Sequence, residues 1–165
     1  MQTQPYSITT LETTSIETIY ISFQKAFEGF RIVSETTLES FSDMLSARKY
    51  DPSLSFGAFD VASGELVSFV LNSVVSDDKS IYIILVGTVP AHRRKGIAKE
   101  IFNNMQSFFK ERDVLLCKTE VLKRNESAQH FYLSLGFEIK QEISTTITTP
   151  NGTREICEYE IVWKM

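Results

Sequence analysis

Cysteine, proline and glycine are sparse in this sequence, and long apolar runs are missing. The 165 residues include two cysteines, Cys117 and Cys157, without metal-ligand spacing, so we expect reduced thiols and no metal. No apolar run approaches the roughly 18 residues that span a bilayer. The segment from Met1 to Pro5 has neither the basic start nor the apolar stretch of a secretory signal. We therefore expect a cytoplasmic protein with no membrane partner.

Positive charge is also in short supply. The chain has 17 Lys and Arg against 21 Asp and Glu, a formal net charge of −4. This balance argues against a nucleic-acid partner, because duplex binding depends on neutralising phosphates. Apolar residues are plentiful by contrast, since 42% of the chain is hydrophobic and 12% aromatic. At this length we expect one domain over residues 1–165.

Hydrophobic periodicity predicts an alternation of strands and helices. Apolar or alternating runs predict strands at residues 6–11, 54–59, 66–75, 81–89, 114–121, 137–148 and 155–163. Helical spacing predicts helices at residues 16–27, 38–45, 97–109 and 125–135. This order predicts an α/β or α+β fold, in which a mixed sheet carries helices on both faces.

Two helix starts carry the pattern of a capping box. Thr14 is followed at the required distance by Glu17, and Thr36 by Glu39. In this motif the side chain of the cap residue accepts from the backbone N–H of the third helical residue, whose own side chain accepts in return from the backbone N–H of the cap. We therefore expect the first two helices to begin directly after Thr14 and Thr36.

The segment at residues 89–98 carries the clearest functional signal. It joins a predicted strand to a predicted helix and places Arg93, Arg94 and Lys95 beside Gly96. The first N–H groups of a helix have no partner within it, and the helix dipole adds positive charge there. The turn therefore predicts a site for an anion such as a diphosphate, with an ordinary solvated basic turn as the alternative.

Glycine spacing narrows the choice of diphosphate. The chain has neither G-x-x-x-x-G-K-[ST] nor G-x-G-x-x-G, which argues against a nucleotide P-loop and a dinucleotide fingerprint. The pattern R-x-x-G-x-A from Arg93 to Ala98, preceded by Pro90, resembles the pyrophosphate loop of the GNAT acyltransferase superfamily, which binds acetyl-CoA. Arg94 stands where that family often has glycine, and its N–H suits the loop only if the residue avoids a positive φ.

A second segment resembles the other signature of the same superfamily. The pattern N-x-x-A-x-x-x-Y-x-x-x-G-F matches at Asn125, Ala128, Tyr132, Gly136 and Phe137. Locally it reads as a short helix with an asparagine N-cap and a glycine stop. Together the two motifs, in a resemblance over roughly residues 54–140, imply the GNAT fold: a central mixed sheet of about six to seven strands flanked by about four helices.

The resemblance also implies the residues that hold acetyl-CoA as acyl donor. In the superfamily the strand before the loop bulges and parts from its neighbour, and the pantetheine arm pairs with the exposed backbone. A glycine in a β-branched run fits a bulge or a close backbone approach. The implied cofactor-binding residues are Val86, Gly87, Thr88, Arg93, Arg94, Lys95, Gly96, Ile97, Ala98, Lys99, Asn125, Ala128 and Tyr132.

Catalytic roles are implied for Tyr132 and Glu120. A phenol aimed at the thioester sulfur can protonate the leaving thiolate, although a core-edge aromatic is the alternative for Tyr132. Glu120 matches a catalytic glutamate of the ribosomal-protein alanine acetyltransferases and would take a proton from the amine. Its alternatives are a water base and an exposed strand position.

We expect the acceptor to be a primary amine, which the sequence does not identify: a small molecule, a peptide N-terminus or a lysine. Phe27, Phe30 and Tyr82 are the candidate substrate-binding residues, together with residues 145–155 of the closing hairpin. A rival from another class is a CoA-binding sensor or interaction module without catalysis. The chain is expected to be a monomer or a homodimer.

Overall fold

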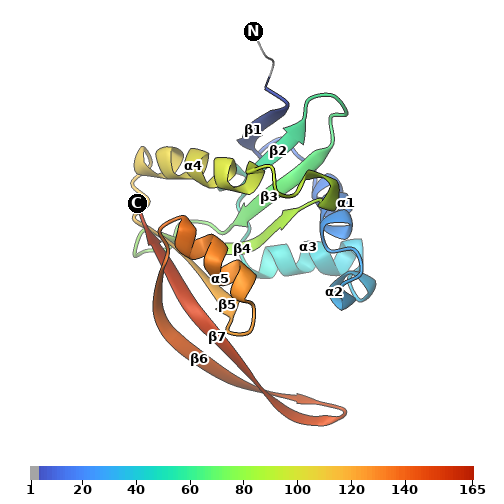
Figure 1. The fold of residues 1–165 in the computed structure, drawn as a ribbon, viewed down its shortest axis with the longest axis vertical. Coiled ribbons are helices and arrows are strands. Elements are labelled where there is room, and N and C mark those ends of the chain that lie inside the picture. The colour runs from blue at the N-terminus through green and yellow to red at the C-terminus, as the bar shows by residue number, and fades with distance from the viewer. Residues whose placement is uncertain (1–3) are drawn as a thin grey trace.

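The computed structural model describes residues 4–165, which form one mixed sheet of seven strands with helices on both faces (Figure 1). Residues 1–3, part of the segment examined for a secretory signal, lie outside the described residues. The strands are β1 (Tyr6–Thr10), β2 (Phe56–Asp60), β3 (Leu66–Asn72), β4 (Ser80–Thr88), β5 (Leu116–Leu122), β6 (Glu138–Thr149) and β7 (Gly152–Lys164). The helices are α1 (Ile16–Ala26), α2 (Arg31–Ser34), α3 (Leu38–Ala47), α4 (Ile97–Lys110) and α5 (Glu126–Ser134), with 3₁₀ turns at Pro52–Leu54 and Pro90–His92. The predicted fold class is confirmed, and the single-turn helix α2 is an addition to the four helices expected.

The sheet divides between its fourth and fifth strands. The strand order is β1-β2-β3-β4-β5-β7-β6, and β4 and β5 form a parallel pair among antiparallel neighbours. Their register covers residues 80–82 against residues 116–118. Beyond it, β4 stays paired with β3 and β5 stays paired with β7, so the two strands diverge. The divergence leaves backbone on facing edges without a strand partner.

The predicted bulge lies in β4, but not at the glycine. The register between β3 and β4 shifts where Leu71 faces Leu85 and Asn72 faces Ile83, which leaves Ile84 as the extra residue. Gly87 has a different reason for being small: a Cβ there would lie 2.6 Å from the ring of Phe69 and 3.1 Å from that of Phe27. The glycine thus admits two aromatic rings against the strand.

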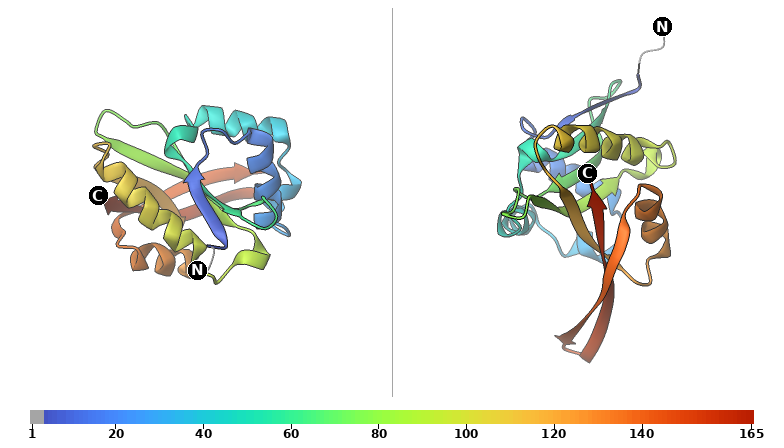
Figure 2. Two further views of the ribbon diagram at one scale, coloured as in Figure 1. Left: turned by 90° about the horizontal axis from the view of Figure 1, so that it is seen from above. Right: turned by 90° about the vertical axis from the view of Figure 1, so that its left-hand side faces the viewer.

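Each face of the sheet has its own core. One core lies under α4 and α5 and is built around Ile101, Phe102 and Phe109, all fully buried. The other lies under α1 and α3 and contains Phe23 and Phe41, whose rings stack at 4.9 Å. Figure 2 shows the two helical layers on opposite sides of the sheet. The core under α4 and α5 draws on β2, β3, β4, β5 and β7, whereas the core under α1 and α3 draws chiefly on β3, so helix packing fixes the positions of the strand ends.

Both predicted capping boxes are wrong by one residue. The cap of α1 is Ser15, whose Oγ accepts from the N–H of Thr18 at 3.2 Å. The box of α3 pairs Thr37 with Ser40, whose N–H donates to Thr37 Oγ1 at 3.1 Å. In a run of Ser and Thr, adjacent hydroxyls are equivalent caps by sequence, and packing decides between them.

The last two strands form a long hairpin. They are joined by a two-residue turn at Pro150 and Asn151, and register pairs extend from Thr149↔Gly152 to Glu138↔Val162. The hairpin projects from the body, so its tip lies far from the helices (Figures 1 and 2). Among residues 4–165, no helix has the length and apolar character needed to cross a bilayer.

Candidate active site

The turn between β4 and α4 presents a helix N-terminus without a side-chain cap. Gly96 is the N-cap and has φ +73°, a left-handed conformation that glycine adopts without strain. The first hydrogen bond of the helix runs from Glu100 N to Gly96 O at 3.0 Å. The amides of Ile97, Ala98 and Lys99 therefore have no acceptor within the helix, as an anion site at a helix start requires.

The three basic residues of this turn are used differently. Arg93 is tied to the protein, because its Nε donates to Thr88 O at 3.1 Å and its Nη2 to Ala26 O at 2.6 Å. Arg94 has φ +62°, so the condition that it avoid a positive φ is not met. A non-glycine residue pays roughly 1–2 kcal/mol in that region. Arg94 and Lys95 are exposed and form no ion pair within residues 4–165.

A cleft of about 310 Å³ occupies the gap where β4 and β5 diverge. Its walls come from both strands, from α5 and from the residue that follows α1. The lining residues are Phe27, Ile83, Ile84, Leu85, Val86, Thr119, Glu120, Val121, Leu122, Asn125, Ala128, Tyr132 and Glu158. Among the residues predicted for the strand edge, Val86 lines the cleft, whereas Gly87 is buried against aromatic rings and Thr88 Oγ1 shares a 2.8 Å hydrogen bond with Ser68 Oγ.

Helix α5 carries three of the predicted residues into this cleft. Asn125 is its N-cap, and Asn125 Oδ1 accepts from Ala128 N at 3.1 Å. Gly136, at φ +102°, follows the C-cap Leu135 and ends the helix as predicted. Asn125, Ala128 and Tyr132 then lie along one side of the helix at spacings of three and four residues, which places them on the same face.

The phenol of Tyr132 is fixed by aromatic packing. Its ring lies 5.1 Å from that of Phe137 and 6.1 Å from that of Phe102, both in edge-to-face arrangements. Burial raises the pKa of Tyr132 above its ordinary value near 10, and the nearby phenol of Tyr82 adds to the effect. The group is therefore protonated throughout the neutral pH range and is available as a donor in the cleft.

Glu120 and Tyr82 are joined across the divergence. Tyr82 Oη donates a hydrogen bond to Glu120 Oε2, which links β4 to β5 just beyond their last register pair. Burial raises the pKa of Tyr82 to about 12, with the carboxylate of Glu120 as the next cause. The hydrogen bond orients the Glu120 carboxylate. Because the phenol of Tyr82 keeps its proton, the carboxylate keeps its negative charge.

A second hollow, of about 540 Å³, adjoins the cleft at Glu120, which lines both. Its walls are the end of α3, the connection from β3 to β4, and Tyr82. The lining residues are Arg48, Lys49, Ser73, Val74, Val75, Ser76, Asp77, Tyr82 and Glu120. Sequence reasoning found Tyr82 but missed Arg48 and Lys49, which carry no motif and read as ordinary basic residues at a helix end.

The other predicted substrate residues lie apart from this hollow. Phe27 lines the cleft, and its ring contacts that of Phe30 at 6.0 Å between centroids. Phe30 is 60% exposed. Residues 145–155 form the end of the hairpin that projects from the body (Figure 1), and they line neither the cleft nor this hollow, although Arg154 and Glu155 line a third one.

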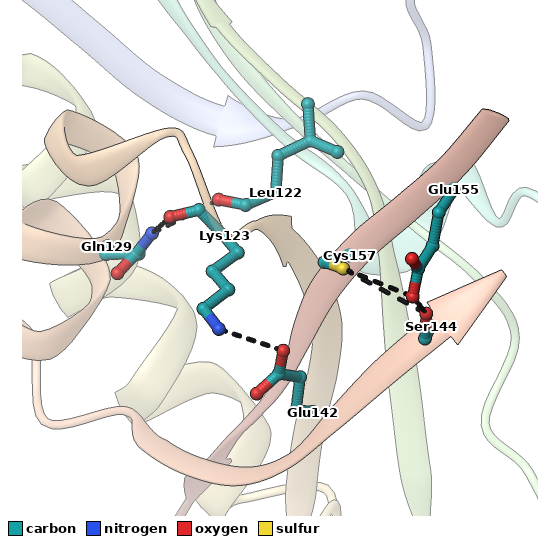
Figure 3. Close-up of polar contacts among 7 residues, drawn as sticks. All are labelled: Leu122, Lys123, Gln129, Glu142, Ser144, Glu155 and Cys157. Carbon is teal, nitrogen blue, oxygen red and sulfur yellow. Dashed lines mark hydrogen bonds and ion pairs between the residues drawn. The ribbon is translucent and has the colours of Figure 1, made fainter.

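A third hollow, of about 430 Å³, lies between the end of β5 and the part of β7 near the hairpin turn, and is lined by Leu122, Lys123, Arg124, Arg154, Glu155, Ile156 and Cys157. It adjoins the cleft at Leu122, which lines both, and Figure 3 shows its polar contacts. Lys123 Nζ pairs with Glu142 Oε1 at 3.0 Å, and Gln129 Nε2 donates to Lys123 O at 2.6 Å. These contacts tie the start of α5 to the hairpin and so hold Asn125 in place.

Residues outside these spaces offer little further chemistry. Cys117 is buried, which raises its pKa to about 12 and keeps the thiol protonated. His92 Nδ1 shares a 2.8 Å hydrogen bond with Tyr6 Oη and so anchors the turn to β1. Within residues 4–165 no group of His, Cys, Asp or Glu side chains has the arrangement of a metal site.

Comparison with solved structures identifies many proteins of the same fold. The ribosomal-protein-S18-alanine N-acetyltransferase from Escherichia coli is 21% identical with a TM-score of 0.73, over 96% of this chain and 93% of that one. Ard1 from Thermoplasma volcanium is 19% identical with a TM-score of 0.74, over 98% and 99%. The PaiA N-acetyltransferase from Thermoplasma acidophilum, solved with coenzyme A, is 17% identical with a TM-score of 0.65, over 98% and 100%. These likenesses show a shared fold.

Family assignment comes from the sequence profile. No curated protein sequence matches the chain. The profile of the Acetyltransferase (GNAT) family matches residues 16–137, which span both motifs, the turn before α4 and the diverging strands. The chain therefore belongs to the GNAT acetyltransferase family.

Proposed function

We propose that residues 1–165 form one N-acetyltransferase domain that transfers an acetyl group from acetyl-CoA to a primary amine. The observation that carries the proposal is that the strand edge and Tyr132 line one cleft, and that β4 leads from this cleft directly into the turn before α4. The turn has free amides at the start of α4, the cleft has unpaired strand edges, and the phenol of Tyr132 lines the same cleft. A diphosphate, an extended amide-containing arm and a thioester would meet them in that order.

The chemical features of the turn fit such a donor. The amides of Ile97, Ala98 and Lys99 and the exposed charges of Arg94 and Lys95 suit a diphosphate. The edge of β4 from Ile83 to Val86 offers backbone groups to the amides of a pantetheine arm. Asn125 uses its Oδ1 for the cap, and its side-chain NH2 donates to no group among residues 4–165, so it can donate to the same arm.

The proposed reaction is direct attack of the amine on the thioester carbonyl. The C–N bond forms first in a tetrahedral intermediate, and the C–S bond breaks when that intermediate collapses. Glu120 accepts a proton from the amine, and Tyr132 donates its proton to the departing sulfur. The raised pKa of Tyr132 keeps the phenol protonated until a thiolate develops beside it. Glu120 then releases its proton to solvent and Tyr132 takes one from solvent, which completes the cycle.

A CoA-binding module without catalysis is the second candidate. Such a module needs the turn before α4, but it needs no buried phenol and no carboxylate where the two spaces adjoin. Tyr132 and Glu120 both line the cleft, which favours the enzyme.

Thiol release from acetyl-CoA in the presence of amines tests the proposal. The protein is first titrated with acetyl-CoA by calorimetry and then assayed against a panel of primary amines with a thiol reagent. We expect saturable binding and amine-dependent thiol release. Tight binding without release from any amine would favour the non-catalytic module, and no binding would contradict both candidates.

A further inference from the structure

The hollow beside Glu120 contains opposite charges that do not neutralise each other. Arg48 and Lys49 line it from the end of α3, Asp77 from the connection after β3, and Glu120 from β5. Within residues 4–165, none of these four side chains takes part in an ion pair. Two cations and two carboxylates thus face one space with their charges available to a guest.

Tyr82 contacts both Glu120 and Arg48. Tyr82 Oη donates to Glu120, and the guanidinium carbon of Arg48 lies 5.8 Å from the centroid of the Tyr82 ring. One aromatic side chain of the hollow thus has an anionic and a cationic neighbour, which form no ion pair with each other within residues 4–165.

Lys49 occupies a position that glycine would fill with less strain. It is the C′ residue of a Schellman motif, because Tyr50 N donates to Leu45 O at 2.9 Å and Lys49 N donates to Ser46 O at 3.1 Å. Its φ is +59°. Lys49 O accepts from Val74 N at 2.9 Å, so the residue is fixed between α3 and the wall of the hollow. A long cation held at a strained position supplies charge that glycine would not.

We propose that this hollow selects acceptors in which the amine is accompanied by an anionic group such as a carboxylate. This inference rests on the proposed function. The amine would lie toward Glu120, where the hollow meets the cleft, and the anion toward Arg48 and Lys49. The volume of about 540 Å³ admits a free amino acid or the first residues of a peptide with an acidic side chain.

Helix stabilisation is the competing explanation for the two cations. Basic residues at a helix C-terminus interact favourably with its dipole, and this role requires no ligand. The two explanations differ in what a substitution changes: a dipole role affects stability, whereas a selection role affects the KM of anionic acceptors alone.

Matched pairs of acceptors test the proposal and separate its two sources. L-Phenylalanine against L-phenylalanine amide probes a free carboxylate, and alanyl-glutamyl-alanine amide against its glutaminyl counterpart probes an acidic peptide. In thiol-release assays we expect kcat/KM to be about tenfold higher for the anionic member of at least one pair, as a charged hydrogen bond provides. Equal use of both members, or preference for the neutral one, overturns the inference but leaves the proposed function intact. Absence of thiol release with every amine overturns both.

Three variants identify the residues responsible. Arg48→Gln and Lys49→Gly should raise the KM of the anionic acceptor about tenfold with little change for the neutral one. Lys49→Gly should at the same time raise Tm, because glycine relieves the positive φ. Lys110→Gln removes a cation from the last turn of α4, outside the hollow, and should leave the preference unchanged. An undiminished preference in both hollow variants, or an equal loss in Lys110→Gln, would overturn the assignment.

Discussion

The cleft and the hollow beside it are built by different means, although they share Glu120. The cleft and the turn before it present mostly backbone: free amides at the start of α4 and the edges of β4 and β5. The hollow presents side chains from a helix end, a loop and two strands. The anion-binding character of the turn therefore depends on backbone conformation, whereas the charges of the hollow depend on which side chains line it.

This difference explains why one region has a sequence signature and the other has none. A backbone site requires particular glycines, caps and turns at fixed spacing, as Gly96 and Asn125 illustrate. A side-chain pocket needs charges that converge in space, and these come from residues distant in the chain. Family membership can therefore be recognised from the sequence of the turn and α5, whereas the proposed choice of acceptor depends on positions such as Arg48, which belong to no motif.

Of the variants, Gly96→Glu should have the largest effect, and it changes the turn before α4 but not the hollow. A Cβ at this position meets nothing within 4 Å, so the side chain has room, but its carboxylate would sit where a diphosphate is proposed to bind. We expect acetyl-CoA affinity to fall more than about 100-fold by calorimetry, since like charges replace an anion site. Gly96→Ala introduces the same backbone strain without the charge and should lose far less. Unchanged affinity in Gly96→Glu would contradict the loop assignment.

Tyr132→Phe removes the proposed acid and keeps the aromatic packing. We expect kcat to fall more than about tenfold, because proton transfer to a leaving group contributes at least that much. The dissociation constant of acetyl-CoA should be nearly unchanged in the same titration. A parallel loss of binding and turnover would indicate that the phenol acts through packing with Phe102 and Phe137.

Glu120→Gln acts at the point where the two regions meet. It removes the proposed base but retains a side chain that accepts from Tyr82. We expect kcat/KM for the amine to fall about tenfold, which is less than the roughly 10²–10⁴-fold typical of general acid–base catalysis because water can substitute in part. Acetyl-CoA affinity serves as the control and should be unaffected. Wild-type kcat/KM across the pH range would assign proton removal to water.

Arg94→Gly should have the smallest effect. Comparison with Arg94→Ala separates the contribution of backbone strain from that of charge. With φ at +62°, glycine should raise the free energy of unfolding by up to about 1 kcal/mol. Loss of one exposed charge should weaken acetyl-CoA binding by about threefold, as expected for a solvated cation near a phosphate. Arg94→Ala should weaken binding equally without the gain in stability. Chemical denaturation and calorimetry on both variants make this comparison.

Much of the fold was predictable from local patterns. The order of strands and helices, the helix from Asn125 to its glycine stop, and the closing hairpin all follow from periodicity and turn residues. Boundaries were less predictable where neighbouring residues are chemically alike. Strand β3 ends at Asn72 and not at Val75, because Val74 and Val75 are about 40% exposed and no longer pair in the sheet.

The β4 edge shows where sequence reasoning reached the right feature at the wrong residue. A bulge was predicted with Gly87 as its marker, but the extra residue is Ile84, and Gly87 is small because Phe69 and Phe27 pack against it. A bulge arises from register with the neighbouring strand, which a single strand sequence does not encode. Likewise, Arg94 has a positive φ because the turn requires that conformation, although the residue type disfavours it.

The narrow pairing between β4 and β5 also bears on how the protein unfolds. Residues 80–82 pair with residues 116–118, so few backbone hydrogen bonds connect one side of the sheet with the other. In native-state amide exchange the exposed β6 should therefore exchange sooner than the buried β3, although one core under α4 and α5 contacts both sides. A bound donor that bridges β4 and β5 would couple the two sides more tightly and slow exchange in the less stable one.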